Sequence, residues 1–267
     1  MALNYSLPEE VKFCSECVIS NQKPITLVET KHSINEKKKT TFFDKDGICD
    51  ACKWSKIKKN EIDWETREKE LIKLLDSYRS KNGSYDVVVP ASGGKDSQYV
   101  AHILKEKYNM NPLTATWAPH IYTEIGKKNF YNMINGGFDN ILVTPNGKVH
   151  RLLTKLAFLN LGHPFQPFIM GQRLVGAKVA LEKKIPLVFY GENVAEYGNR
   201  IEDNYSPLMN NDLITSFDVD DDELYISGVK IGELKKKYNL TLNDFEVYRS
   251  PKIEHIEQLG LQVHYMS

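Results

Sequence analysis

An alternation of short apolar runs with longer helical patterns constrains this chain more than any other feature. Four runs have the length and composition of buried strands: residues 86–89, 113–117, 140–144 and 186–190. Four segments between them have helical spacing: residues 97–107, 124–134, 148–161 and 171–184. Strands that alternate with helices pair in parallel, because the connection between two parallel strands is about as long as a helix. We therefore expect an α/β fold built on a three-layer parallel sheet.

The first predicted strand ends in the sequence Ala91-Ser92-Gly93-Gly94-Lys95-Asp96-Ser97. Two glycines allow a sharp turn and a close approach to a ligand, and the N–H groups that open the next helix favour phosphate. Lys95 adds a positive charge, and Ser92 and Ser97 add hydroxyls. The loop is not a Walker A motif, because Val89 stands where its first glycine belongs. A glycine turn that only caps a helix is the alternative; the strand–loop–helix context favours phosphate binding.

Four cysteines form two Cys-x-x-Cys pairs before residue 53: Cys14 with Cys17, and Cys49 with Cys52. Four thiolates at this spacing are typical of a tetrahedral structural zinc site. Two disulfides or a redox pair are the alternatives, and disulfides are disfavoured in a cytosolic chain. If zinc takes all four thiols, none remains for catalysis.

The composition predicts a cytoplasmic protein with neither a signal peptide nor a membrane span. In 267 residues, no apolar run approaches the roughly 18 residues that a span needs. Lys and Arg number 35, and Asp and Glu also number 35. A net charge of zero argues against nucleic acid as a partner.

The stretch from Ser92 to Ser97 resembles the SGGxDS loop of the PP-loop ATP pyrophosphatases. This resemblance implies a five-stranded adenine-nucleotide α-hydrolase-like fold. It also implies that ATP is cleaved to AMP and pyrophosphate, with AMP transferred to a substrate oxygen. The loop would hold the departing phosphates with Mg²⁺, and the adenine would lie near Ala115, Thr116 and Trp117.

The tandem cysteine pairs ahead of that loop resemble the N-acetyl sugar amidotransferases of bacterial surface-glycan synthesis. Further stretches are similar to their pseudaminic-acid branch: residues 117–122, 150–151, 165–168, 189–193 and 196–198. The resemblance implies adenylation of an acetamido carbonyl and replacement of its oxygen by ammonia nitrogen, giving an acetamidino sugar. The products would be pseudaminic acid, legionaminic acid or O-antigen sugars, used in lipopolysaccharide synthesis or flagellin glycosylation. Because no cysteine remains to hydrolyse glutamine, we expect a separate glutaminase subunit to supply ammonia.

The candidate catalytic residues are Lys95, Asp96, His120 and Glu192. The candidate nucleotide-binding residues are Ser92, Gly93, Gly94, Lys95, Asp96, Ser97, Thr116, Trp117, Arg173 and Glu192. Several assignments leave alternatives open. Asp96 binds magnesium or caps the helix. Glu192, with Asn193 and Glu196, holds magnesium, guides ammonia, contacts the sugar or is a solvated carboxylate.

His120 acts on the substrate, deprotonates ammonium or only forms a loop hydrogen bond. Arg173 neutralises a phosphate or a sugar carboxylate, or faces solvent. His150 and Arg151 lie early in a predicted helix, and we expect both at the surface.

We expect four parts along the chain. These are a zinc module (1–60), a linker helix (61–82), the PP-loop domain (83–205) and a C-terminal extension (206–267), truncated relative to the family. The helical pattern that precedes the PP-loop domain runs from Trp54 to Lys81. Two other functions compete with the amidotransferase: a tRNA-modifying PP-loop enzyme, and a non-catalytic zinc scaffold that binds ATP.

Overall fold

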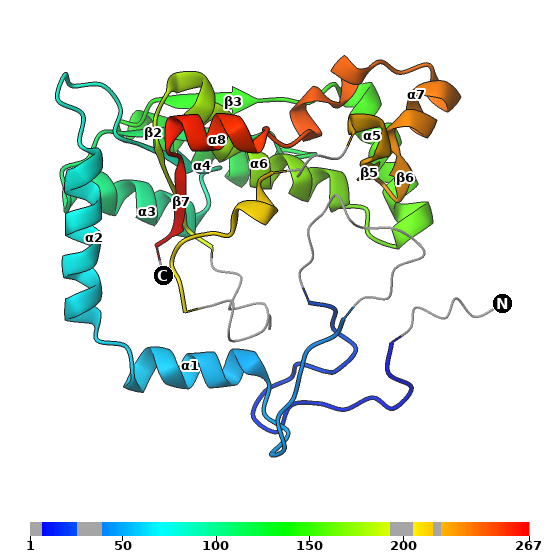
Figure 1. Ribbon diagram of the computed structural model, residues 1–267, viewed down its shortest axis with the longest axis horizontal. Helices are drawn as coiled ribbons and strands as arrows, with labels where there is room; N and C mark the ends of the chain where they lie inside the picture. Colours follow the sequence, from blue (N-terminus) through cyan, green and yellow to red (C-terminus); the bar gives the residue numbers. More distant parts are fainter. Residues whose placement is uncertain (1–6, 26–38, 193–204, 216–219, 267) are drawn as a thin grey trace. The chain divides into compact units, whose positions relative to one another are not determined.

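The computed structural model describes residues 7–25, 39–192, 205–215 and 220–266 (Figure 1). These residues fall into two compact units. The first unit contains 7–25, 39–73 and 205–207. The second contains 74–192, 208–215 and 220–266.

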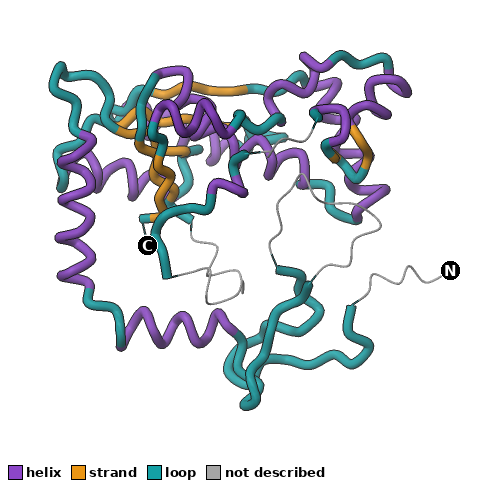
Figure 2. The backbone as a smooth tube through the Cα atoms, in the orientation of Figure 1, coloured by secondary structure: helices purple, strands orange, loops and turns teal. Residues whose placement is uncertain are grey.

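The second unit is built on a parallel sheet of five strands in the order β3-β2-β1-β4-β7. The strands are β1 (Val87–Pro90), β2 (Pro112–Trp117), β3 (Asn140–Val143), β4 (Leu187–Tyr190) and β7 (Gln262–Tyr265). Figure 2 shows them in orange between the helices. Every neighbouring pair is parallel. The predicted α/β class and parallel sheet are therefore confirmed, whereas the PP-loop type of this fold stays a prediction.

Helices connect the strands on both sides of the sheet. They are α3 (Lys95–Glu106), α4 (Glu124–Asn135), α5 (Gly147–Leu161), α6 (Gln166–Lys183) and α8 (Ile253–Leu259). From β1 the chain moves outward to β2 and β3, then returns past β1 to β4 and β7. Because such crossovers are right-handed, the change of direction puts α3 and α4 on one face and α6 and α8 on the other. The direction reverses between β1 and β4, which is where open α/β sheets bind ligands.

The structure places α6 five residues earlier than the expected start at Gly171. The helix begins at Gln166, and Pro167 lies in its first turn. Proline fits there because the first N–H groups of a helix have no intrahelical partner. Gln166 is fully buried, so this added turn belongs to the core.

The segment after residue 205 also contributes to the sheet. It contains a short hairpin, β5 (Tyr225–Ile226) and β6 (Val229–Lys230), followed by α7 (Ile231–Tyr238). Three 3₁₀ turns accompany them: η4 (Asn211–Leu213), η5 (Asp221–Glu223) and η6 (Leu242–Tyr248). Its last strand, β7, pairs with β4 along all four residues. The described residues from 208 onward lie in the same compact unit as the sheet. The expected boundary of a C-terminal extension at 206 stays a prediction.

The first unit consists mainly of loops followed by a helix, as Figure 2 shows for the segment before α1. Helix α1 spans Asp50–Asn60, and α2 spans Trp64–Tyr78 and ends in the second unit. The single helical pattern expected from Trp54 is thus broken. Asp63 causes the break, because its carboxylate accepts hydrogen bonds from the backbone N–H groups of Glu65 and Thr66, each at 3.1 Å.

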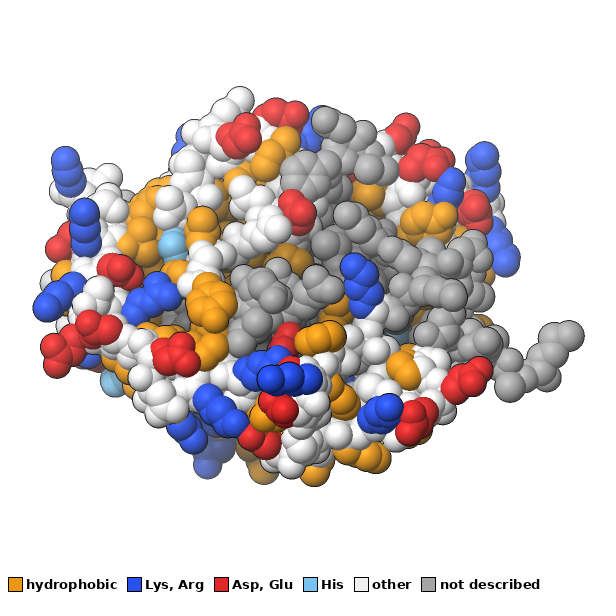
Figure 3. Space-filling view, turned by 60° about the horizontal axis from the view of Figure 1, so that its bottom comes forward, with side chains coloured by type: hydrophobic (Ala, Val, Ile, Leu, Met, Phe, Trp, Pro, Cys, Tyr) orange, Lys and Arg blue, Asp and Glu red, His pale blue; other side chains and the backbone are white. Residues whose placement is uncertain are grey.

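Among the described residues, none of the helices combines the length and apolar character that a membrane crossing requires. On the face drawn in Figure 3, basic and acidic side chains are interspersed rather than gathered by sign.

Candidate active site and metal centre

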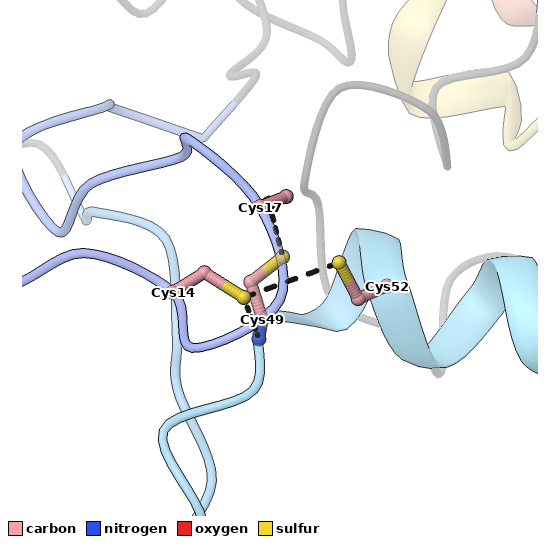
Figure 4. Close-up of side chains that lie close together, drawn as sticks. All are labelled: Cys14, Cys17, Cys49 and Cys52. Atoms are coloured by element: carbon pink, nitrogen blue, oxygen red, sulfur yellow. Dashed lines mark hydrogen bonds between the residues drawn. The ribbon is translucent and has the colours of Figure 1, made fainter.

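The four cysteines of the first unit converge on one point (Figure 4). Their sulfur atoms all lie within 4.8 Å of one another. Cys14 Sγ is 3.9 Å from Cys52 Sγ, and Cys17 Sγ is 3.6 Å from Cys49 Sγ. A tetrahedral zinc with bonds of about 2.3 Å would hold its sulfur ligands about 3.8 Å apart. The group therefore fits a metal such as zinc, and these separations are far from the roughly 2.0 Å bond of a disulfide.

Backbone turns present these thiols. The Cys14 N–H donates to the Ile19 carbonyl at 2.8 Å and closes the first turn. In the second turn, Asp44 Oδ1 accepts from the N–H groups of Asp46 and Ile48, each at 2.9 Å. Gly47 supplies the left-handed φ of +75° that this turn requires. Helix α1 starts directly after Cys49, so its positive N-terminal end faces the thiols.

The surroundings of the thiols favour a cation. The N–H groups of Glu16 and Cys49 lie 3.4 Å and 3.3 Å from Cys14 Sγ. Burial alone would raise the pKa of Cys14, but backbone hydrogen bonds outweigh it and lower that pKa to about 6. Burial and the neighbouring thiols raise the pKa of Cys52. The pKa values of Cys14 and Cys52 are thus shifted in opposite directions, and a divalent cation bound to the thiolates would favour their deprotonated form.

In the second unit, the predicted phosphate loop joins β1 to α3. Gly93 has a φ of +90°, and a Cβ there would lie 2.7 Å from the backbone nitrogen of Phe130 in α4. Only glycine lets the loop pass this close to another helix. Gly94 precedes the first residue of α3, and a Cβ there would meet nothing closer than 3.9 Å. The loop backbone is thus fixed against α4 at Gly93 and open at Gly94.

The charged residues of the loop stand at the start of α3. Lys95 Nζ and Asp96 Oδ1 are 2.8 Å apart, and their side chains are 90% and 59% exposed. Ser97 Oγ donates to the Gly94 carbonyl at 3.2 Å. Asp96 therefore neutralises Lys95 in this structure, and a phosphate that binds the helix N-terminus would compete with that carboxylate for the lysine.

The carboxyl end of β4 lies beside this loop. A Cβ on Gly191 would be 3.0 Å from the carbonyl carbon of Asp96, so the two backbones are in close contact. Glu192 follows and is exposed. The structure therefore brings Asp96 and the end of β4 together, whereas a role for Glu192 stays a prediction.

The charges of Arg173 and Glu192 both affect the pKa of Tyr265, at the end of β7. Burial raises the pKa of Tyr265 to about 12; the charge of Arg173 opposes this rise and that of Glu192 adds to it. Tyr190 is also close, since its hydroxyl donates to the Arg173 carbonyl at 2.6 Å. Sequence reasoning did not select either tyrosine, because only the sheet order brings β7 next to β4.

The residues assigned to adenine, Ala115, Thr116 and Trp117, have buried side chains. Thr116 is 1% exposed; its hydroxyl donates to the Ala91 carbonyl and accepts from Asn140 Nδ2 at 2.8 Å. Trp117 is 4% exposed and packs over Gly171, where a Cβ would lie 2.2 Å from the indole. An adenine contact at this strand end would therefore involve main-chain atoms. The adenine site itself stays a prediction.

His120 lies in a group of rings rather than at the loop. Its ring stacks on that of His150 with centroids 4.5 Å apart. It also contacts the rings of Phe165 and Phe168. The expectation that His150 lies at the surface is wrong, because it is 7% exposed. Its Nδ1 is 2.7 Å from the hydroxyl of Tyr248, a partner 98 residues away in sequence. Arg151 is exposed as expected. Asn193 and Glu196 lie outside the described residues.

Comparison with known proteins leaves the family open. No family profile matches this chain. An uncharacterized protein of Methanocaldococcus jannaschii is 32% identical over 79 residues, which are 30% of this chain and 28% of that protein. The similarity therefore covers less than a third of either chain.

Proposed function

We propose that this chain is an ATP-dependent amidotransferase that converts the acetamido group of an N-acetyl sugar into an acetamidino group. One observation carries the proposal. The loop Ser92–Ser97 leads from β1 into α3, at the point where the strand order of the sheet reverses. This is the position at which open α/β sheets bind nucleotides, and Gly93 holds the loop backbone against α4.

The proposed reaction needs positioned charges and no covalent nucleophile. The acetamide oxygen attacks the α-phosphorus of ATP, and the bond to the β-phosphate oxygen breaks, releasing pyrophosphate. Ammonia then adds to the activated carbon, the carbon–oxygen bond breaks, and AMP leaves with the oxygen. The amidine and a proton remain. Such a site mainly aligns reactants and stabilises the departing anion.

The described residues support specific roles. The N–H groups at the start of α3 and the exposed ammonium of Lys95 suit the departing pyrophosphate. Asp96 and Glu192 are carboxylates near that loop that would hold magnesium, which neutralises phosphate charge when bound. Arg173, near the ends of β4 and β7, suits the phosphate of AMP. In this proposal His120 acts on the sugar substrate.

The cysteine inventory supports a nitrogen source outside this chain. All four cysteines lie in the metal-binding group of the first unit. None remains to hydrolyse glutamine, so the proposed enzyme takes ammonia from a separate glutaminase subunit. The proposed pathway is bacterial surface-glycan synthesis, with a pseudaminic, legionaminic or O-antigen sugar as product.

The test is to incubate the protein with ATP, magnesium, ammonium and a panel of acetamido sugars. We expect AMP and pyrophosphate to form only with the correct sugar, together with the small mass loss that replacement of oxygen by NH gives. AMP formation that depends on tRNA would favour the tRNA-modifying alternative. ATP binding with no turnover on any sugar would favour the scaffold alternative.

A further inference from the structure

Six aromatic side chains of the second unit form a continuous group, here called the ring group: Trp117, His120, His150, Phe165, Phe168 and Tyr248. His120 contacts His150, Phe168 and Phe165 with centroid separations of 4.5 Å, 5.1 Å and 5.8 Å. Trp117 meets the rings of Tyr248 and His150 edge-on, at 5.8 Å and 6.2 Å. The residues of the group come from the end of β2 and the loop after it, from α5, from the start of α6, and from η6.

The ring group has an outer and an inner layer. Phe165 is 55% exposed, His120 is exposed and Phe168 is half-buried. Trp117, His150 and Tyr248 are buried beneath them, at 4%, 7% and 1% exposure. His120 follows β2, and Phe165 and Phe168 lie at the start of α6. All three therefore lie at the carboxyl edge of the sheet, as does the loop after β1. Two exposed rings, with the half-buried Phe168 beside them, thus lie at the edge where open α/β sheets bind ligands.

The inner layer holds polar atoms that the described part of the chain does not satisfy. His150 Nδ1 is paired with Tyr248, but His150 Nε2 and the indole Nε1 of Trp117 are buried with no hydrogen-bond partner. Native proteins pair nearly all buried polar atoms with protein, water or ligand. Two such nitrogens in touching rings therefore need a hydrogen-bonding group beyond those of the described residues.

The ring group is uncharged at neutral pH. Burial lowers the pKa of His120, and burial together with His120 lowers that of His150 to about 4. Burial also raises the pKa of Tyr248, so its hydroxyl keeps its proton. Rings without net charge pack well against the C–H faces of a sugar, and buried ring nitrogens suit neutral hydroxyl or amide groups. A phosphate would find no cation among these six side chains.

We propose that the outer rings, His120, Phe165 and Phe168, bind the neutral ring of the acetamido sugar. This inference rests on the proposed function and locates its second substrate on the α6 side of the sheet edge. The nucleotide occupies the loop after β1, and the two sites adjoin because β1 and β2 are neighbouring strands. Phe165 and Phe168 become specificity residues on the outer side of the ring group.

The test uses saturation-transfer NMR with the methyl glycoside of N-acetylglucosamine at millimolar concentration, without ATP or ammonium. We expect the wild-type protein to transfer saturation to the acetyl and ring protons. Phe165→Ala and His120→Ala should each reduce the transfer by about fivefold or more, the loss expected for one ring contact. Phe158→Ala is the control, because Phe158 is 62% exposed on α5 and lies outside the ring group.

Calorimetric titration with ATP and magnesium on the same variants separates the possible ligands. We expect ATP affinity to stay within about twofold of wild type, since the outer rings do not contact the nucleotide in this proposal. No transfer to the wild-type protein, or equal transfer to all variants, would overturn the inference. Loss of ATP affinity in Phe165→Ala with normal sugar binding would also overturn it, because adenine would then occupy the rings. Failure of the proposed function shows separately, as absence of AMP formation with ammonium.

Discussion

Gly93 shows how one residue can limit a whole loop. Its left-handed φ and its contact with the α4 backbone both exclude a side chain. The atoms that a Cβ would meet are main-chain atoms of Asn129 and Phe130, which cannot rotate away as a side chain would. The neighbouring Gly94 has free space instead. Two adjacent glycines in the same motif therefore have different reasons to be glycine.

Lys95→Ala should lower AMP formation by about 100-fold or more, because the loss of one group that stabilises a developing anion typically costs that much in rate. The thermal midpoint of unfolding should hardly change, since an exposed ion pair contributes little. Lys127→Ala is a matched control, because Lys127 is also exposed and also pairs with an acidic neighbour, Glu124, at 3.2 Å. Unchanged AMP formation in Lys95→Ala would remove the assignment of this loop to phosphate.

His150 should make the fold sensitive to acid. An unfolded histidine titrates near pH 6.5, whereas burial and His120 lower the pKa of His150 to about 4 in the fold. Between these values the unfolded chain binds the proton and the folded chain does not. The contribution is therefore fully present above about pH 6.5 and is lost as pH falls toward 4, by at most about 1.4 kcal/mol per pH unit.

The variant His150→Phe isolates this effect, because it keeps a ring in the same place without a titrating group. Burial also lowers the pKa of His264 to about 4, and that contribution stays in both proteins. Urea unfolding across this pH window should show wild type losing stability relative to the variant on acidification. Parallel losses in both proteins would contradict a neutral, buried His150.

At the scale of elements, α6 approaches the sheet through small residues. Gly171 lies under the indole of Trp117, and Gly176 faces Pro90 and Val188. Gly171→Ala should destabilise the protein by about 1–3 kcal/mol, because the added methyl meets an aromatic ring in a packed core. Thermal or urea unfolding measures this loss. Gly147→Ala is the control, since a Cβ there meets nothing within 4 Å, and it should be neutral or slightly stabilising.

Local pattern predicted the elements of the second unit, but not their long-range partners. The strands before residue 191 and their helices follow from apolar runs and helical spacing. The break between α1 and α2 depends on one capping side chain, Asp63. His150 was misplaced at the surface because Tyr248, which buries and pairs it, comes from a distant segment. The ring group has the same origin. The resemblance marks the stretches 117–122, 150–151 and 165–168, but nothing local in the sequence indicates that they meet one another and Tyr248.

For the molecule as a whole, metal binding and folding of the first unit should be inseparable. Cys14→Ser or Cys49→Ser removes one of four converging sulfur ligands, and metal-binding energy is folding energy in such small units. We expect zinc content, measured by plasma mass spectrometry, and thermal stability to fall together. Ser15→Ala leaves the ligands intact and is the control. Metal-free protein that keeps its melting temperature would contradict this coupling.

The nitrogen source is also a property of the whole chain. With ATP and the correct acetamido sugar, the protein alone should form product from ammonium and none from glutamine, because no cysteine lies outside the group of four converging thiols. Product analysis by mass spectrometry distinguishes the two. Product from glutamine in ammonia-free buffer would contradict this expectation and reopen the assignment of the four thiols.

The pairing of β4 with β7 has a consequence for biosynthesis. These neighbours are joined only after the chain has passed through the hairpin, α7, η6 and α8. While residues 262–265 are still unsynthesised, β4 presents an open hydrogen-bonding edge with apolar side chains on both faces. In that state, the open edge of β4 can pair with strands of other chains. Translation speed and chaperone capture along residues 191–261 should therefore govern how much of this protein reaches its native fold.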